Sequence, residues 1–430
     1  MRIGIKALGC PKNEADCAVL RAILEQRSHE IVEDIEEAEA VILDTCGFIE
    51  EAKKDSISEI FDFIDHKKRR KFLLFVKGCL VQRYFEDLTR EIHEVDGWFG
   101  VVPPERIADA VEKGEKKVIY RHPESIYSTS VRFDSGPYAY IKIADGCSHT
   151  CSFCAIPAFK GSYRSRRMNF VISEAEQLVR NGVLEIILVA QDTSAYGIDT
   201  DEGTLCDLLK KLDSIDGRFW IRVMYLHPDH ITPQLIDTMT TCKKVLPYFD
   251  IPVQHGSDKI LEKMGRQKKS EQILDILQQI RSAQPDAVIR TSVIVGFPGE
   301  SRNDFEILLE FLKEAQFDRL GCFVYSDEEG TSAKSFFPKI PHDTALARQE
   351  ELMLLQKEIS RKRMSRWTGK TIETLVEEQE NGYYIARSFM DAPEVDGNVL
   401  VQSRDSLIIP GFYHVTITAS LDYDLEGVAL

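Results

Sequence analysis

The sequence has no long hydrophobic stretch and a deficit of positive charge. None of its apolar runs approaches the roughly 18 residues that a membrane span requires. Residues 1–8 already have the pattern of a strand, so no signal peptide is expected. Against 70 Asp and Glu there are 54 Lys and Arg, a formal net charge of −16. That charge argues against a general attraction to nucleic acid or anionic lipid, and we expect a cytoplasmic protein without a membrane partner.

The composition is otherwise that of an ordinary globular protein. With 430 residues, 43% of them hydrophobic and 29% charged, the chain is long enough for several domains with large buried cores. Ten cysteines in such a chain are better explained as reduced thiols or metal ligands than as disulfides. The positions of the cysteines are therefore informative.

Three cysteines form a C-x3-C-x2-C triplet directly after a strand-like run at 138–144. They are Cys147, Cys151 and Cys154. Three thiolates on one loop can bind three irons of a cubane cluster and leave the fourth iron free for a substrate or cofactor. A zinc knuckle is the alternative, but it needs a fourth ligand, and His149, the only local candidate, has none of the usual zinc spacings. We rank zinc below a cluster and a disulfide framework lower still.

Three more cysteines follow strand-like runs in the first 120 residues. The runs at 3–8, 40–44 and 71–76 alternate with amphipathic segments, which is typical of βαβ units, and Cys10, Cys46 and Cys79 come directly after them. Ligands of a parallel sheet gather beyond the carboxyl ends of its strands, so these thiols should converge in a second cluster site. The alternative is that free cysteines are common core residues, as we expect for Cys17.

The rest of the chain predicts a partial barrel and a small β-domain. Strand candidates separated by helical patterns occur at 138–144, 185–190, 219–226, 248–253, 288–295 and 320–325, which indicates six βα repeats rather than eight. An amphipathic helix is predicted at about 343–367. Short strands broken by glycines follow, as in a small antiparallel barrel. The predicted α/β architecture comprises a parallel α/β domain (1–120), a polar linker (121–136), the partial barrel (137–365) and the antiparallel barrel (366–430).

The triplet, with Phe153 before its third cysteine, resembles the cofactor-binding loop of the radical S-adenosylmethionine (SAM) enzymes. The whole chain, in this order of parts, resembles the methylthiotransferase family of those enzymes, in which the C-terminal barrel is a TRAM domain. Residues 8–13, 44–46, 77–79 and 391–397 are similar to the branch that modifies a ribosomal protein rather than tRNA. In the tRNA branch a glutamine-type residue typically follows the first cysteine, where this chain has Pro11 and Lys12.

The resemblance implies an enzyme with two 4Fe-4S clusters and S-adenosyl-L-methionine. It would attach a methylthio group to the β-carbon of an aspartate in the twelfth small-subunit ribosomal protein, using two SAM molecules and an electron donor such as flavodoxin or ferredoxin. Both clusters must then face one cavity. As a hypothesis, the SAM side of that cavity is lined by Phe153, Gln191, Gln254, Arg290 and Tyr325. Glu300 stands one place later than the family pattern requires.

The charge of the C-terminal domain favours a protein substrate. Residues 366–430 contain eleven acidic and four basic residues, whereas an RNA-binding barrel normally presents a basic face. The basic run at 67–71 argues the other way, but we expect it to be a solvated loop. Two alternatives remain: a tRNA methylthiotransferase of the same fold, and a non-catalytic iron–sulfur scaffold.

Overall fold

The computed structural model describes residues 1–118, 126 and 130–430. Its first part is a six-stranded parallel sheet in the order β2-β1-β3-β4-β5-β6. The strands are β1 (Arg2–Ala7), β2 (Glu30–Ile31), β3 (Ala40–Thr45), β4 (Leu73–Gly78), β5 (Gly97–Phe99) and β6 (Lys117–Val118). The connecting helices are α1 (Pro11–Gln26), η1 (Ile35–Glu37), α2 (Glu50–Arg69), α3 (Cys79–Glu91) and α4 (Pro104–Lys113).

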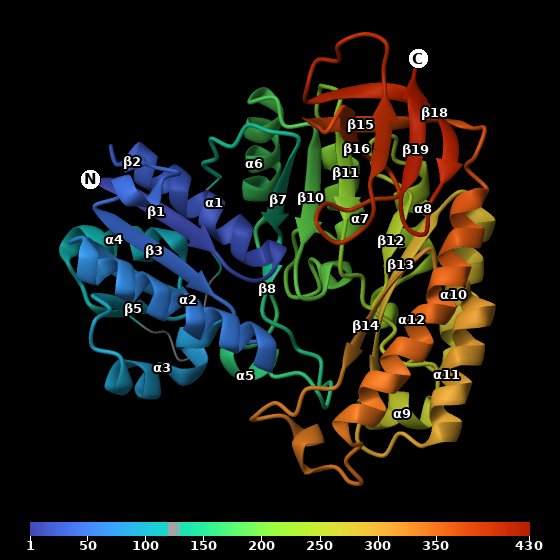
Figure 1. The fold of residues 1–430 in the computed structure, drawn as a ribbon, viewed down its shortest axis with the longest axis horizontal. Coiled ribbons are helices and arrows are strands. Elements are labelled where there is room, and N and C mark those ends of the chain that lie inside the picture. The colour runs from blue at the N-terminus through green and yellow to red at the C-terminus, as the bar shows by residue number, and fades with distance from the viewer. Residues whose placement is uncertain (119–125, 127–129) are drawn as a thin grey trace.

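Helices cover both faces of this sheet, as the unbroken apolar pattern of its central strand requires. Ala40 and Ile42 of β3 pack in one core with side chains of α1 and α4. Their neighbours Val41 and Leu43 point to the opposite face and pack with α2 and α3. Successive side chains of a strand alternate between faces, so a strand buried on both sides must be apolar throughout. Figure 1 shows the resulting three layers in blue.

The central part is an open barrel of six consecutive parallel strands. Two three-stranded sheets, β11-β10-β7 and β12-β13-β14, are joined by a bridge between Ile221 and Val245. The strands are β7 (Tyr138–Lys142), β10 (Glu185–Val189), β11 (Trp220–Val223), β12 (Tyr248–Asp250), β13 (Val288–Val295) and β14 (Arg319–Val324). All six predicted strands are therefore present. One large core joins these strands to the surrounding helices.

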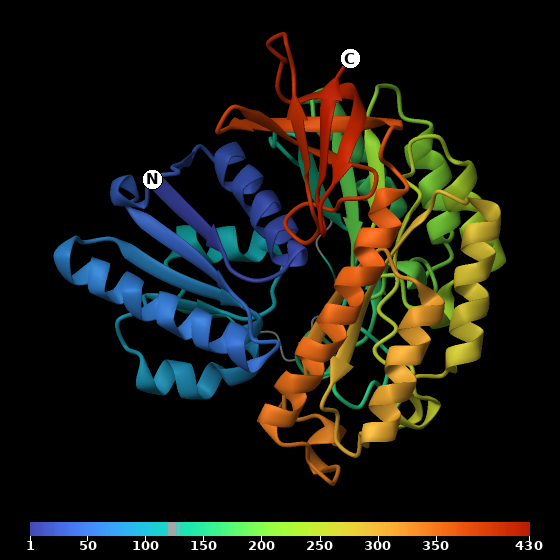
Figure 2. The same cartoon turned by 45° about the vertical axis from the view of Figure 1, so that its right-hand side comes forward.

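Most helices of this part form its outer layer (Figure 2), whereas α5 lies against α3 of the N-terminal domain (Figure 1). The helices are α5 (Ile156–Lys160), α6 (Met168–Arg180), α7 (Leu205–Asp213), α8 (Pro233–Thr241), α9 (Asp258–Lys263), α10 (Ser270–Ala283), α11 (Arg302–Ala315) and α12 (His342–Ser365). Shorter elements are the strands β8 (Ala144–Asp145) and β9 (Arg164–Ser165) and the 3-10 helices η2 (Thr193–Ala195), η3 (Pro228–His230) and η4 (Ser332–Ser335). The long helix predicted at about 343–367 is α12.

The C-terminal part is a closed five-stranded barrel in the order β15-β16-β17-β19-β18. Its strands are β15 (Thr371–Glu380), β16 (Tyr383–Ser388), β17 (Val399–Gln402), β18 (Gly411–Ser420) and β19 (Leu425–Ala429). It packs against the amino ends of the central strands: Arg387 contacts Glu185, the first residue of β10, and Arg319, the first residue of β14, contacts Asp391 at 2.5 Å. The carboxyl ends of the central strands therefore remain open.

Two sequence expectations need comment. The basic run at 67–71 is not a solvated loop in full, because Lys67 lies in the last turn of α2 and contacts Asp96; cations are favourable at a helix carboxyl end. Residues 119–125 and 127–129 of the predicted linker lie outside the described residues, and the domain boundaries stay predictions. At the end of that segment, Arg132 is buried and bonds Glu174 at 2.6 Å. In the described part of the chain, no helix is long and apolar enough to cross a membrane.

Candidate functional site

Cys10, Cys46 and Cys79 come together at one edge of the N-terminal sheet. Cys10 caps α1 after β1, Cys46 follows β3, and Cys79 begins α3 after β4. These three strands are parallel neighbours, so their carboxyl ends meet. A Cβ added at Gly9 would lie 2.8 Å from the Cβ of Cys46, so the turn before Cys10 rests directly on the second cysteine.

The environment of these thiols disfavours free thiolates. Burial raises the pKa of Cys46 to about 11 and that of Cys79 to about 12, and the neighbouring thiols add to both shifts. The Sγ of Cys10 donates a hydrogen bond to Oδ1 of Asn13 at 3.4 Å. A bound cation would reverse this balance, because metal ligation requires the thiolate form.

Cys147, Cys151 and Cys154 lie on one loop at the carboxyl end of the first central strand. The loop is tied down by the N–H of Cys147, which donates to the carbonyl of Gly161 at 3.1 Å, and by Ser152, which donates to the carbonyls of Lys263 and Met264. Burial raises the pKa of Cys147 to about 11 and that of Cys154 to about 12. Arg266 donates to the Sγ of Cys151 at 3.7 Å, so a cation already lies beside this triplet.

The arrangement of the thiols does not match a single bound ion. In the described part of the chain, neither triplet brings its three sulfur atoms within 4.8 Å of one another. One zinc ion with bonds of about 2.3 Å would need them closer, at roughly 4 Å. His149 does not complete a zinc site with them either, because its Nε2 bonds Asp192 at 2.8 Å and its ring stacks on His227. The wider spacing suits a multi-iron cluster held by three thiolates.

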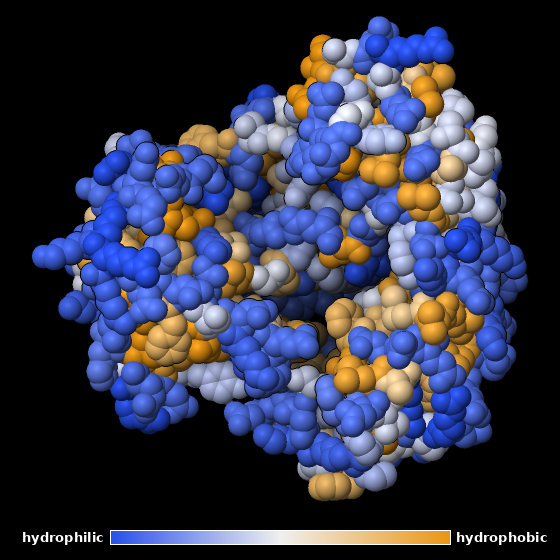
Figure 3. All heavy atoms as spheres, in the orientation of Figure 1, coloured by the Kyte–Doolittle hydropathy of each residue, from blue (hydrophilic) through white to orange (hydrophobic). Residues whose placement is uncertain are grey.

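One cysteine of the N-terminal triplet lies beside the segment that follows the other triplet, across the boundary between the N-terminal and central domains. Cys79 packs in one small core with Ala155, the residue after Cys154, and with Phe159 of α5. A small cavity of about 30 Å³ beside Cys79 is also lined by Asp145 and Lys160. Figure 3 shows this face of the molecule hollowed between the two domains.

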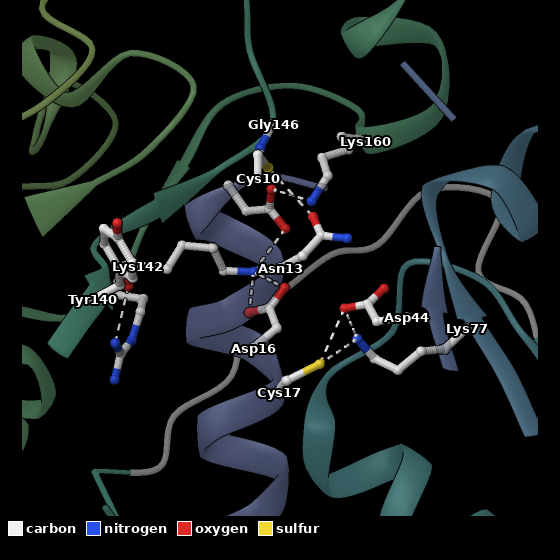
Figure 4. A network of polar contacts seen from close by, with 12 residues as sticks. Cys10, Asn13, Asp16, Cys17, Asp44, Lys77, Tyr140, Lys142, Gly146 and Lys160 are labelled. Carbon is white, nitrogen blue, oxygen red and sulfur yellow. Dashed lines mark hydrogen bonds and ion pairs between the residues drawn. The ribbon is translucent and has the colours of Figure 1, made fainter. Parts of the chain in front are cut away.

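A network of ion pairs joins the domains beside the thiols (Figure 4). Lys142 of β7 pairs with Asp16 of α1 at 2.7 Å and with Asp145 at 3.2 Å. Lys160 also contacts Asp145, at 3.0 Å. Burial would raise the pKa of Asp145, but Lys142 and Lys160 hold it well below its usual range. Asp44 and Lys77 form a second buried pair, which the buried Cys17 also contacts.

The residues predicted to contact SAM have different local surroundings. Phe153 and Tyr325 pack on the same apolar cluster around Phe297, whose ring lies 5.4 Å from that of Tyr325. Gln191 donates to Asp145 at 3.1 Å, and its buried Oε1 accepts no hydrogen bond in the described part of the chain. Gln254 has a left-handed backbone with φ of 73°. Such strained residues are frequent at binding sites.

Arg290 differs from the other four. Its guanidinium pairs with Asp250 at 2.9 Å and with Asp396 of the C-terminal barrel at 3.4 Å. The structure thus gives Arg290 two carboxylate partners inside the protein. Glu300 is likewise occupied: it accepts from the backbone N–H of Gly296 and pairs with Arg348 of α12 at 2.8 Å.

Sequence reasoning missed Tyr225, whereas His227 is one of the polar residues that the sequence places after the strand predicted at 219–226. Tyr225 follows β11 with a φ of 63°, and the ammonium of Lys12 lies 3.6 Å from the centre of its ring. His227 lies against Arg266, and its pKa falls to about 2 because of burial and that cation. Tyr225 stood in the predicted strand at 219–226 with no local signal of its own. Proximity to the thiols arises only from the fold.

Family models match three parts of the chain. The Radical SAM superfamily matches residues 141–312, Uncharacterized protein family UPF0004 matches residues 2–100, and the TRAM domain matches residues 368–430. Among solved structures, the radical S-adenosylmethionine methyltransferase TsrM from Kitasatospora setae superposes with a TM-score of 0.60 at 14% identity, over 75% of this chain and 74% of that one. At this identity the likeness concerns the fold alone.

Curated relatives match over nearly the whole length. Two proteins named "Ribosomal protein uS12 methylthiotransferase RimO" are similar to this chain, at 57% identity in Pseudothermotoga lettingae and 54% in Thermotoga maritima. Each alignment covers 99% of this chain and 99% of the relative. The two thiol triplets thus stand in a chain that belongs to the RimO family of radical SAM methylthiotransferases.

Proposed function

We propose that this protein adds a methylthio group to the β-carbon of an aspartate in ribosomal protein uS12, using two 4Fe-4S clusters and two molecules of S-adenosylmethionine. The overall change replaces one hydrogen of a methylene group with sulfur that carries a methyl group. The observation that carries the proposal is the packing of Cys79, from one thiol triplet, against Ala155 and Phe159, which follow the other triplet across one domain boundary.

The chain's own residues would hold the cofactors and shape the cavity. Cys10, Cys46 and Cys79 would bind one cluster, and Cys147, Cys151 and Cys154 the other. When bound, a cluster with S-adenosylmethionine supplies a carbon radical that removes a hydrogen atom, which acid–base side chains do not do. The protein's own side chains bind and orient SAM and the substrate, and they exclude water from the cavity. Phe153, Gln191 and Tyr325 are the side chains that we propose for the SAM side, with Gln254 contributing through its backbone turn.

Arg290 is proposed to act through its neighbours rather than by direct contact. Its pair with Asp250 fixes a carboxylate that also accepts the backbone N–H of Tyr225 at 3.0 Å. Arg290 would therefore set the position of the turn that carries Tyr225.

The charge of the C-terminal barrel supports a protein substrate less strongly than its composition suggested. Several of its acidic residues are paired with cations: Glu377 with Arg387 and Asp391 with Arg319 inside the molecule, and Asp422 with Lys357 at the surface. Exposed acidic residues are fewer, namely Glu378, Glu380, Glu394 and Asp405. An RNA partner is still disfavoured, because the exposed surface offers few basic residues for phosphates. A uS12 substrate also implies a cytoplasmic reaction with a donor such as flavodoxin or ferredoxin.

Mass spectrometry of uS12 tests the assignment. Anaerobic reduced protein with SAM should increase the mass of uS12 by one methylthio group and release 5′-deoxyadenosine. Modification of a tRNA anticodon stem-loop instead of uS12 would make the protein a tRNA methylthiotransferase. Absence of 5′-deoxyadenosine at full iron loading would favour a non-catalytic scaffold.

A variant separates the two cluster sites. Cys46→Ala should remove roughly half of the bound iron and all sulfur insertion, while SAM cleavage stays detectable. Cys242→Ala, at another half-buried cysteine, is the matched control and should leave both activities unchanged. Loss of SAM cleavage together with sulfur insertion in the Cys46 variant would contradict two separate sites.

A further inference from the structure

Lys12 connects the two halves of the candidate site. It is the second residue of α1, two positions after Cys10, and its ammonium lies over the ring of Tyr225 at 3.6 Å from the ring centre. Tyr225 belongs to the central barrel, directly after β11. The positive charge of Lys12 is therefore held where the N-terminal cysteine site faces the barrel.

This charge has no carboxylate partner in the described part of the chain, where no Asp or Glu oxygen lies within 4.0 Å of it. The nearby carboxylates are bound to other cations. Asp16 pairs with Lys142, and Asp145 pairs with Lys142 and Lys160. Asp250 pairs with Arg290. The partner of Lys12 is thus an aromatic ring, whereas the partners of Lys142, Lys160 and Arg290 are carboxylates.

The ammonium of Lys12 has an aromatic face, and no hydrogen-bonded anion, as its close partner in the described part of the chain. A cation–π contact is weaker than a hydrogen-bonded ion pair in such a setting. The ring itself is firmly placed, because Tyr225 has a left-handed backbone and donates its N–H to Asp250 at 3.0 Å. The arrangement holds a cation ready for an anion that the protein does not supply.

We propose that Lys12 binds the carboxylate of the aspartate side chain that is modified, and so selects aspartate over asparagine. The inference rests on the proposed function. A carboxylate bound by Lys12 holds the adjacent β-methylene carbon within one bond of the anchored group, beside Cys10. The compact ammonium of Lys12, with its rotatable donors, can bind the carboxylate of aspartate in this way. It would bind the neutral amide of asparagine only weakly.

The test measures binding of uS12 to the anaerobic holoprotein, with either aspartate or asparagine at the target position. The unmodified enzyme should bind the aspartate form roughly 10- to 100-fold more tightly, the usual range for a hydrogen bond to a charged group. Lys12→Met should reduce this ratio to about one and leave the affinity for the asparagine form unchanged. Lys12→Arg should restore part of the ratio. Lys6→Met is the matched control, because Lys6 pairs with Glu59 and should keep the full ratio.

Two further readouts separate this role from a structural one. Lys12→Met should keep its iron content and its SAM cleavage, since neither depends on the substrate carboxylate. If the iron content of Lys12→Met falls, the Lys12→Arg variant provides the test. A Lys12→Arg protein with normal iron content and no preference for the aspartate form would overturn the proposal. A Lys12→Met protein that still prefers aspartate would overturn it as well. If the unmodified enzyme leaves the mass of uS12 unchanged, the proposed function fails first and the inference fails with it.

Discussion

The two thiol sites are built in opposite ways. Cys147, Cys151 and Cys154 lie on one short loop, and that loop is held by backbone contacts with Gly161 and Met264. The other three cysteines stand at the ends of three different strands and meet only because those strands are parallel neighbours. The first site is therefore specified by a short stretch of sequence, and the second by the topology of a whole sheet.

The difference has consequences for how each site fails. A site on one loop loses its ligand set when one cysteine is changed, but its geometry does not depend on the alignment of distant strands. A site assembled from strand ends also depends on whatever holds those ends in register. Here that includes the buried pair of Asp44 and Lys77, which stand opposite each other on neighbouring strands, two residues before Cys46 and Cys79 respectively. The first two predictions below each change one of the two sites and leave the other intact, and the third concerns the helix that follows Cys10.

The largest effect is expected at the loop site. Cys151→Ala should abolish both SAM cleavage and sulfur insertion, because the proposed radical-generating cluster loses one of its three protein ligands. Roughly half of the iron should remain at the N-terminal site. Cys206→Ala removes a buried thiol outside both sites and should keep the iron and both activities. Iron analysis and 5′-deoxyadenosine release measure the result; full SAM cleavage in the Cys151 variant would refute the loop as the cofactor site.

A smaller effect, specific to the sheet-built site, is expected from Lys77→Met. This change leaves the Asp44 carboxylate buried without its cation, which typically costs about 3–5 kcal/mol of unfolding free energy. Iron at the N-terminal site and sulfur insertion should fall, whereas SAM cleavage should persist. Denaturant unfolding and iron analysis measure both. Lys68→Met breaks only an exposed pair with Asp65 and should leave stability nearly unchanged. Equal losses in the two variants would contradict the role of the buried pair.

The smallest effect concerns the contact of α1 with the C-terminal barrel. Burial, together with the charge of Glu394, raises the pKa of Glu14 to about 7 from the ordinary value of 4.5. Between these values the folded state binds more protons than the unfolded state, so stability falls as pH rises from about 4.5 through 7. Glu14→Gln removes the titrating group and should flatten this decline.

Melting temperatures of both proteins between about pH 5 and pH 8 provide the measurement. The advantage of the Glu14→Gln variant over the unmodified protein should grow with pH. The exposed Glu271→Gln is the control and should leave the pH dependence as it is. A constant difference between Glu14→Gln and the unmodified protein across this range would show that Glu14 keeps its ordinary pKa.

The contrast also explains which features the sequence could reveal. The loop triplet has a local spacing, and the six central strands have clear apolar runs, so both were predictable. Short strands such as β2, β6 and β19 were missed because two to five residues carry too little periodicity. The partners of Arg290 were unpredictable for another reason, since Asp396 lies more than a hundred residues away, in another domain. Long-range pairs leave no local pattern.

Glycines beside the N-terminal cysteines limit how this site can change over evolution. Gly9 and Gly78, each directly before a cysteine, have φ values of 111° and 110°, which other residues rarely adopt. At Gly9 a side chain would also press on Cys46. Gly9 and Gly78 therefore cannot be replaced without straining the turns that carry Cys10 and Cys79. Substrate preference can therefore change through side chains beside these turns, such as Lys12, and through the barrel rim, but not through the two glycines themselves.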